Sequence, residues 1–333
     1  MKKILVLGGT GFVGRILTEN LLKTDNSVTL FNRGKRNPDI FPGVRKIVGD
    51  RLTDDITKIA NENWDTVIDF SCMMPDNLEK IVGLLKGKAG RYIFVSTVSV
   101  YPMDDPGFWK SPVKEDDGTL DCTPEQRKDP DVMATYGQKK AECERILTAN
   151  DWLDSIIFRP GLIYGRYDYT DRFYYWLYKV EKQDRVLMPN EGKDKFTNTY
   201  SEDFAQLIQK AIDVKTHNKI YNAVTHKPVS IKDYLDASCK LLDKSPKFIK
   251  ASLKFLEENE VGAWSDLPVW LGGMDLVVDF SRALKDFPVS FHSFNDSLKG
   301  CIEYYSSLGW PEPKTGLPED RETALLEKLA TKS

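Results

Sequence analysis

The feature that most constrains the fold of this chain is a glycine-rich turn close to its amino terminus. The apolar segment Ile4–Leu7 runs directly into the turn Gly8–Gly14, and a helical pattern, Arg15–Leu22, follows. In a strand–turn–helix unit of this kind, glycines permit a tight bend, close approach of a pyrophosphate and close packing of the helix on its strand. The unpaired N–H groups of the helix then face the phosphates. We therefore expect dinucleotide binding by Gly8, Thr10, Gly11, Phe12, Val13 and Gly14.

Short segments rich in Val, Ile, Leu and Phe recur through the first half of the chain, and helical patterns lie between several of them. Strands that are apolar on both faces and alternate with helices are typical of a parallel sheet covered on both sides. Residues 1–160 are therefore predicted to form a doubly wound α/β domain of the Rossmann type. The expected strands are Lys3–Leu7, Ser27–Phe31, Arg45–Val48, Thr66–Phe70, Arg91–Ser96 and Ser155–Phe158.

After Arg159 the sequence becomes aromatic-rich and irregular, most clearly from Tyr164 to Trp176. Residues 161–333 are expected to form mainly a smaller substrate-binding lobe, with some segments returning to the first domain. The long acidic loop from Tyr101 to Val132 is expected to be functional, because structureless connections of that length are uncommon in compact domains. Further elements are expected at Tyr136–Thr148, Glu202–Ile212, Lys219–Val224, Ile231–Leu242 and Ser293–Leu308.

The charge balance and the cysteines narrow the class of partner. With 47 basic and 50 acidic residues the net charge is -3, which provides no global field for nucleic acid or an anionic membrane. Five scattered cysteines without a CxxC pair argue against a disulfide framework and a zinc site. No stretch reaches the roughly 18 apolar residues of a membrane span. We expect a cytoplasmic protein with a small-molecule substrate and no metal.

The end of the second expected strand bears on the choice of cofactor. An NAD site normally has an acidic residue here to hold the ribose hydroxyls, but this chain has Asn32 followed by Arg33, with Lys35 and Arg36 behind them. Asn32 does not repel a 2′-phosphate, and Arg33 can pair with one through charge-assisted hydrogen bonds. The pattern favours NADP over NAD, and a solvated basic turn is the alternative.

Two residues after later strands complete the expected cofactor site. Asp50 follows the third strand and can accept a hydrogen bond from the adenine amino group, although a plain turn aspartate fits equally well. Ser71 follows the fourth strand at the same edge of the sheet. In an open parallel sheet, ligands bind at this carboxyl edge.

A tyrosine, a lysine and a threonine form the candidate catalytic set. Tyr136 and Lys140 stand one helical turn apart, and Thr97 follows the strand that ends at Ser96. A phenol with a pKa of about 10 is a weak base at neutral pH. We expect the Lys140 ammonium, with an oxidised nicotinamide, to lower the pKa of Tyr136 so that it exchanges a proton while hydride moves. Thr97 would hold the substrate oxygen, with Ser99 as a weaker candidate.

Arg166 and Arg172 are the candidate anchors for an anionic or polar substrate group. Both lie just past the strand Ser155–Phe158, beyond its carboxyl end. A surface or ion-pair role is the alternative for either arginine.

These motifs, in this order, resemble those of the extended short-chain dehydrogenase/reductases, the NAD-dependent epimerase/dehydratase family. The resemblance implies that Thr97, Tyr136 and Lys140 are catalytic, that Lys140 also binds the nicotinamide ribose, and that the chain forms a homodimer. It rests on Gly8–Gly14, Val95–Tyr101, Tyr136–Lys140, Arg159–Gly165 and Tyr200–Ala205.

Two departures from the family pattern concern the substrate. Pro160-Gly161-Leu162 stands where members acting on sugar nucleotides usually have an asparagine, which disfavours a nucleotide sugar. Val98 and Ser99 replace the acid pair of dehydratases, which disfavours 4,6-dehydration. The runs Phe31–Lys35, Gly49–Arg51 and Asp168–Trp176 are similar to an isoflavone-reductase-like branch or to chloroplast RNA-binding relatives.

The sequence therefore favours an NADP-dependent oxidoreductase or epimerase that moves a hydride to or from a hydroxyl or carbonyl carbon of a small molecule, a sugar or nucleotide sugar among the candidates. The alternative is a non-catalytic NADP-sensing or RNA-binding protein on the same scaffold, because fold does not fix function. The full set of Thr97, Tyr136 and Lys140 favours the enzyme.

Overall fold

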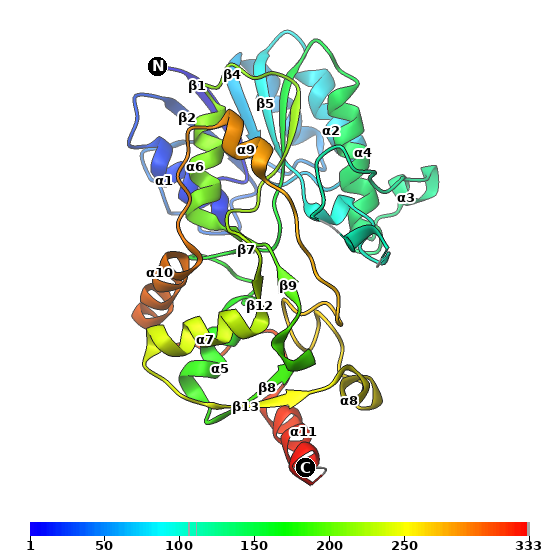
Figure 1. The fold of residues 1–333 in the computed structure, drawn as a ribbon. Coiled ribbons are helices and arrows are strands. Elements are labelled where there is room, and N and C mark those ends of the chain that lie inside the picture. Colours follow the sequence, from blue (N-terminus) through cyan, green and yellow to red (C-terminus); the bar gives the residue numbers. More distant parts are fainter. Residues whose placement is uncertain (106, 111, 332–333) are drawn as a thin grey trace.

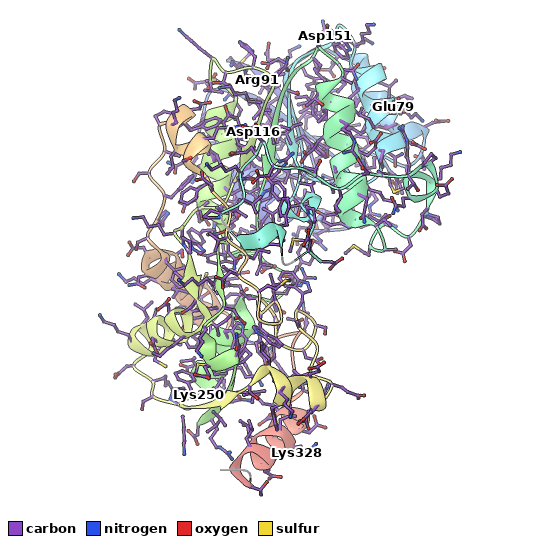
Figure 2. The ribbon with its side chains drawn as sticks, turned by 45° about the vertical axis from the view of Figure 1, so that its right-hand side comes forward. Glu79, Arg91, Asp116, Asp151, Lys250 and Lys328 are labelled. Atoms are coloured by element: carbon purple, nitrogen blue, oxygen red, sulfur yellow. The ribbon has the colours of Figure 1, made fainter. Side chains whose placement is uncertain are left out.

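The computed structural model describes residues 1–105, 107–110 and 112–331. It has two parts, a sheet domain and a lobe built mainly from the second half of the chain (Figure 1). In Figure 2 the labelled Glu79 and Asp116 lie on the sheet domain, and Lys250 and Lys328 lie on the lobe. No helix in these described stretches combines the length and apolar character needed to cross a membrane.

The sheet domain contains a seven-stranded sheet with the order β11-β6-β5-β4-β1-β2-β3, and every neighbouring pair is parallel. The predicted doubly wound parallel sheet is confirmed. The chain order reverses beside β1, which pairs with both β2 and β4, and such a switch point opens a crevice at the carboxyl ends of the strands. The strands are β1 (Lys3–Leu7), β2 (Ser27–Asn32), β3 (Arg45–Val48), β4 (Trp64–Asp69), β5 (Ala89–Val95), β6 (Asp154–Arg159) and β11 (Lys219–Asn222).

Helices cover both faces of this sheet, which explains why the strands carry apolar residues on both sides. Ile4 and Val6 of β1 belong to the core beneath α1 (Phe12–Leu21) and α6 (Ser201–Ala211). Leu5 and Leu7 belong to the opposite core, beneath α2 (Pro75–Leu84) and α4 (Tyr136–Thr148). Alternate residues of a strand point to opposite faces, so a doubly buried strand has an unbroken apolar run.

Two expected elements differ from the structure. The segment Arg45–Val48 is an edge strand that pairs only with β2, and Val48 is 57% exposed, so β3 is not buried on both faces as expected. Helix α1 begins at Phe12, inside the glycine turn, rather than at Arg15. Val13 and Gly14 therefore already belong to α1, and the N-terminus of this helix lies within the turn.

The lobe has its own core, and most of the aromatic run after Arg159 packs into it. Phe173 stacks between Tyr164 and Tyr234, with ring centroids 3.7 and 4.4 Å apart. Helix α5 begins inside this run, where we had expected irregular chain. The lobe elements are β7 (Ile163–Tyr164), α5 (Tyr174–Lys182), β8 (Arg185–Pro189), β9 (Lys195–Phe196), β10 (Thr199–Tyr200), β12 (Val229–Ser230), α7 (Ile231–Leu242), β13 (Lys247–Ala251), α8 (Leu253–Glu258), α10 (Phe294–Ser307) and α11 (Glu319–Thr331).

The chain returns from the lobe to the sheet domain. Helix α6 packs beside α1, strand β11 extends the sheet next to β6, and α9 (Ser281–Asp286) lies against β11 (Figure 1). The long loop after β5 contains a short helix, α3 (Pro124–Lys128), with a capping box between Thr123 and Gln126. The lobe is thereby joined to the sheet domain by several crossings of the chain.

Helix α4 packs very closely on the turn Val98–Val100 that follows β5. A Cβ atom at Gly137 would lie 2.1 Å from the carbonyl oxygen of Ser99, so only glycine fits there. This contact brings the first turn of α4, with Tyr136, onto the carboxyl end of β5.

We predict that Gly137→Ala destabilises the protein by about 1–3 kcal/mol, because the helix must move away from the Ser99 carbonyl. The matched control is Gly83→Ala in α2, where an added Cβ meets nothing within 4 Å. The control is expected to be about 0.5–1 kcal/mol more stable than the unaltered protein, because alanine has a higher helix propensity than glycine. Urea unfolding measures both variants, and similar effects of the two substitutions would contradict the close contact.

Candidate active site

The glycine turn has the geometry that its spacing predicts. Gly8 has φ 95°, a conformation that favours glycine, and a Cβ at Gly14 would lie 2.3 Å from the Gly8 carbonyl oxygen. Thr10 and Val13 are buried. The Gly11 N-cap provides no side chain to accept from the first N–H groups of α1, so these donors point from a helix N-terminus at the switch point of the sheet.

The end of β2 contains an amide with an unused donor. Asn32 Oδ1 accepts from the Gly34 N–H at 2.9 Å, whereas Asn32 Nδ2 is buried with no partner in the described part of the chain. Arg33 is exposed. Arg36, rather than Arg33, approaches the glycine turn, because a Cβ at Gly11 would lie 3.0 Å from Arg36 Cδ.

A buried ion pair that the sequence pattern did not single out lies beside these residues. Arg51 donates to both carboxylate oxygens of Asp69 at 2.9 and 2.8 Å, and to Ser71 Oγ at 2.7 Å. Burial would raise the pKa of Asp69, but the Arg51 guanidinium and hydrogen bonds outweigh it and hold that pKa at about 2. Asp50 accepts from the Leu52 N–H at 3.0 Å, which is the contact of a turn aspartate.

Thr97 and Tyr136 are neighbours at the carboxyl end of β5. The Thr97 hydroxyl caps the Val98–Val100 turn by accepting from the Ser99 N–H at 3.1 Å. Burial raises the pKa of Tyr136, and a hydrogen bond with the Thr97 side chain opposes that rise. The two side chains that we expected to act on one substrate oxygen therefore lie at the same end of β5.

Lys140, one turn after Tyr136 on α4, is buried. Its ammonium donates to the carbonyl oxygens of Cys72 and Val95 at 2.8 and 2.7 Å and lies 3.9 Å over the Phe94 ring. We expected this charge, together with an oxidised nicotinamide, to lower the pKa of Tyr136, and that effect stays a prediction. In the structure burial raises the pKa of Tyr136.

A second buried network fixes α4 to the sheet. Arg159, at the end of β6, donates to the Glu144 carboxylate of α4, with the shortest contact at 2.6 Å, and to the Tyr101 hydroxyl at 2.8 Å. Ser96 donates to the same carboxylate. Tyr101 of the motif after β5 is therefore a structural residue, and its hydroxyl donates in turn to Asn222 of β11.

The two arginines predicted as substrate anchors are both engaged with protein groups. Arg166 forms ion pairs with Glu19 of α1 and Glu202 of α6. The guanidinium of Arg172 lies 5.1 Å from the centroid of the Trp264 ring. Arg166 already pairs with two carboxylates, and anchoring of a substrate by either arginine stays a prediction.

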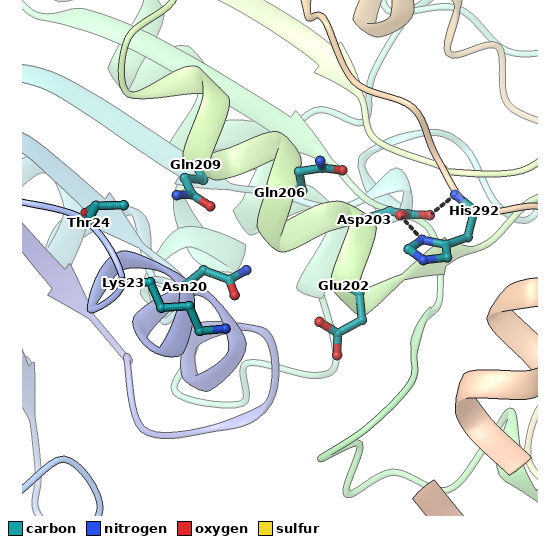
Figure 3. A pocket seen from close by; sticks show the side chains of 8 residues that line it. All are labelled: Asn20, Lys23, Thr24, Glu202, Asp203, Gln206, Gln209 and His292. Atoms are coloured by element: carbon teal, nitrogen blue, oxygen red, sulfur yellow. Dashed lines mark hydrogen bonds and ion pairs between the residues drawn. The ribbon is translucent and has the colours of Figure 1, made fainter. Parts of the chain in front are cut away.

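A polar groove between α1 and α6 shares no residue with the predicted site. Asp203 of α6 accepts from the His292 backbone N–H at 3.0 Å and contacts its Nδ1 at 2.6 Å (Figure 3). Among the described residues no group of three or more His, Cys, Asp and Glu side chains has the arrangement of a metal site. The groove is lined by Asn20, Lys23, Thr24, Glu202, Asp203, Gln206, Gln209 and His292.

Asp168, in the loop after β7, is a buried carboxylate that is only half satisfied. Its Oδ1 accepts from the Thr170 N–H and hydroxyl, both at 2.8 Å, while Oδ2 is buried without a partner in the described chain. Burial raises the pKa of Asp168 to about 6. We had not singled out this residue from the sequence.

The doubly wound sheet, the glycine turn at its switch point and the Tyr–Lys helix have the arrangement that the motif resemblance to the extended short-chain dehydrogenase/reductases implies. Residues 72–223 match the model of the NAD dependent epimerase/dehydratase family. The resemblance expected from the motifs is thereby confirmed.

Individual proteins similar to this chain have several activities. The chloroplast stem-loop binding protein of 41 kDa b of Arabidopsis thaliana is 26% identical over 72% of this chain and 62% of its own length. The 2-alkyl-3-oxoalkanoate reductase of Stenotrophomonas maltophilia is 28% identical over 61% of this chain and 63% of its own. The chain thus spans less than two thirds of the length of these curated relatives. The UDP-glucuronic acid 4-epimerase of Bacillus cereus, solved with NAD, superposes with a TM-score of 0.68 at 20% identity, covering 93% of this chain and 100% of that chain.

We predict that Asp168→Asn stabilises the protein at pH 8 but has little effect near pH 4. The pKa is about 6 in the folded protein and about 3.9 when unfolded, so the folded state binds more protons between these values and stability falls as pH rises through that window. Removing the charge should raise the free energy of unfolding by up to about 2–3 kcal/mol above pH 6. Urea unfolding at the two pH values measures this effect, and an equal change at both would contradict it.

Proposed function

We propose that the chain is an NAD(P)-dependent enzyme that transfers a hydride to or from a hydroxyl or carbonyl carbon of a small molecule, with Tyr136 as the general acid/base. The observation that carries the proposal is the close packing of the first turn of α4, with Tyr136, on the turn after β5 that Thr97 caps. This end of β5 lies two strands from β1, whose carboxyl end bears the glycine turn. Hydroxyl groups at that edge are well situated for chemistry on a ligand bound in the switch-point crevice.

The residues around the turn fit a dinucleotide. The uncapped N-terminus of α1 offers N–H groups for phosphates, and Asn32 Nδ2 and Arg51 Nε are buried donors without partners in the described chain. Buried donors are normally satisfied, so these two positions suit the acceptor atoms of an adenosine moiety. When bound, the nicotinamide cofactor supplies the hydride chemistry that no side chain provides.

The chain's own residues would then hold the substrate and move its proton. Tyr136 exchanges a proton at its phenol oxygen, and Thr97 shares a hydrogen bond with the same substrate oxygen. An ammonium has three donors, and two of those on Lys140 go to the Cys72 and Val95 carbonyls. The third remains for a ribose hydroxyl, in keeping with the role that the family resemblance implies.

We further propose that NADP is preferred over NAD, although the solved relative from Bacillus cereus contains NAD. Asn32 stands where a carboxylate would repel a 2′-phosphate, and the exposed Arg33 and nearby Arg36 can neutralise one.

The substrate class and the net reaction are proposed more broadly. Hydride transfer with cofactor exchange makes a reductase, as in the Stenotrophomonas relative's name, whereas a retained cofactor suits an epimerase, as in the Bacillus cereus neighbour's title. A secondary alcohol or ketone satisfies both schemes, and sugars are among the candidates.

A second candidate function is the RNA binding considered from the sequence, and the observation that favours it is the Arabidopsis relative's name, a stem-loop binding protein. It predicts that the purified chain binds labelled RNA and that the binding weakens as salt rises, because phosphate contacts release counterions. Strong, salt-dependent binding by a chain that binds no dinucleotide would favour this second function over the first.

We predict that NADPH binds at least about tenfold more tightly than NADH, because a charge-assisted hydrogen bond to the 2′-phosphate is gained. Arg33→Ala should reduce this preference, and Asn32→Asp should reverse it. Titration of cofactor fluorescence measures each affinity. Equal affinity of the unaltered protein for both cofactors, or tighter binding of NADH, would show that the basic turn is only solvated surface.

We predict that Tyr136→Phe keeps dinucleotide binding but lowers turnover at least about 100-fold, because the ring remains and only the transferable proton is lost. Lys140→Ala should weaken both binding and turnover. The measurement is steady-state kinetics with a panel of secondary alcohols, ketones and sugars, together with cofactor titration. Near-native turnover of Tyr136→Phe on any accepted substrate would mean that another group handles the proton.

A further inference from the structure

We infer that Arg36 and Tyr169 form a clasp across the glycine turn that slows the release of a bound dinucleotide. The clasp joins the loop after β2 to the loop after β7, which belongs to the lobe. The inference rests on the proposed function, because it concerns the same dinucleotide site, and it adds how that site retains its ligand.

The first half of the clasp is the loop after β2, which is tied to the glycine turn. Asn37 Nδ2 donates to the Thr10 carbonyl at 2.9 Å. A Cβ at Gly11 would lie 3.0 Å from Arg36 Cδ and 3.4 Å from its Nη1, so the Arg36 side chain lies directly against the turn. An arginine in this position can also pair with phosphate oxygens.

The second half is Tyr169, which the lobe presents to the same turn. The Arg36 guanidinium lies 4.0 Å from the centroid of the Tyr169 ring. The Tyr169 and Phe12 rings also pack edge to face, with their centroids 6.2 Å apart and their planes at 78°. Tyr169 is 53% exposed, so its ring is not part of a core and can move.

The Tyr169 phenol also has an electrostatic effect on the proposed acid/base. Burial raises the pKa of Tyr136, and the nearby Tyr169 phenol adds to that rise.

The loop that carries Tyr169 is held firmly at both sides of it. Tyr167 and Asp171 have φ 66° and 56°, left-handed conformations that are uncommon for side chains other than glycine. Asp168 is buried, and Arg166 is paired with Glu19 and Glu202. Strained backbone that the surroundings hold in position is typical of ligand clamps.

A dinucleotide can enter or leave the glycine turn only when the contact between Arg36 and Tyr169 opens. Slow opening keeps a cofactor bound from one turnover to the next. This behaviour suits the epimerase form of the proposed function, which has no net exchange of cofactor.

The test is stopped-flow measurement of NADPH release, in which excess NADP⁺ displaces the fluorescent cofactor from the full chain, together with equilibrium titration. Tyr169→Ala should increase the release rate by roughly 2- to 30-fold, the range expected for loss of a cation–π contact that must open before release. Tyr169→Phe, which keeps the ring, should stay within about twofold of the unaltered protein. In an Arg36→Met background, Tyr169→Ala should have a smaller effect, because the stacking partner is already gone.

An unchanged release rate in Tyr169→Ala, or tighter binding by that variant, would overturn the clasp while leaving the proposed function intact. An equal change in the release rate on Tyr169→Ala with and without Arg36 would also overturn it, because the two side chains would then act independently. Failure of the unaltered chain to bind either NADPH or NADH would instead overturn the proposed function, and the clasp with it. Thermal unfolding of each variant verifies that the fold is retained.

Discussion

The buried ion pair between Arg159 and Glu144 is the interaction on which the geometry of the candidate site depends. Removing two charges from water is costly, and the cost is offset only when the remaining donors and acceptors are satisfied. Here Ser96, Tyr101 and the Glu115 carbonyl complete the network. Because Glu144 lies on α4 and Arg159 on β6, the pair fixes the helix against the carboxyl edge of the sheet. The pair thereby also fixes the positions of Tyr136 and Lys140, which lie on the same helix.

Close backbone packing at two glycines also positions helices at the carboxyl edge of the sheet. Gly137 lets the first turn of α4 approach the Ser99 carbonyl, and Gly14 lets α1 approach the turn after β1. The two glycines bring two helices to the same edge of the sheet, one with N–H groups for phosphates and one with the Tyr–Lys pair. The lobe contributes Tyr169, so a ligand in the crevice would touch both parts of the molecule.

The fold was predictable because its signals are local. Continuous apolar strands, a glycine turn and helical spacing each depend on residues close together in sequence, and the doubly wound sheet follows from them. The edge position of β3 was not predictable, because it depends on how many strands pair beyond it. Thr97, Tyr136 and Lys140 could be nominated from spacing and family resemblance, and their catalytic roles stay predictions.

The contacts that sequence could not supply are long-range. Asp69 pairs with Arg51 across 18 positions, and nothing in either local sequence indicates this partner. Lys140 donates to backbone carbonyls, which have no side-chain signature. Tyr169 stands in an aromatic run whose neighbours are core residues, so its exposed position beside Arg36 could not be distinguished from packing.

The most direct test of the central claim is mass spectrometry of the small molecules that leave the purified protein on denaturation. We expect a nicotinamide dinucleotide, either retained from the cell or taken up after incubation with NADP⁺ and desalting, at close to one molecule per chain. A protein that releases no dinucleotide after incubation with either NADP⁺ or NAD⁺ would contradict the account.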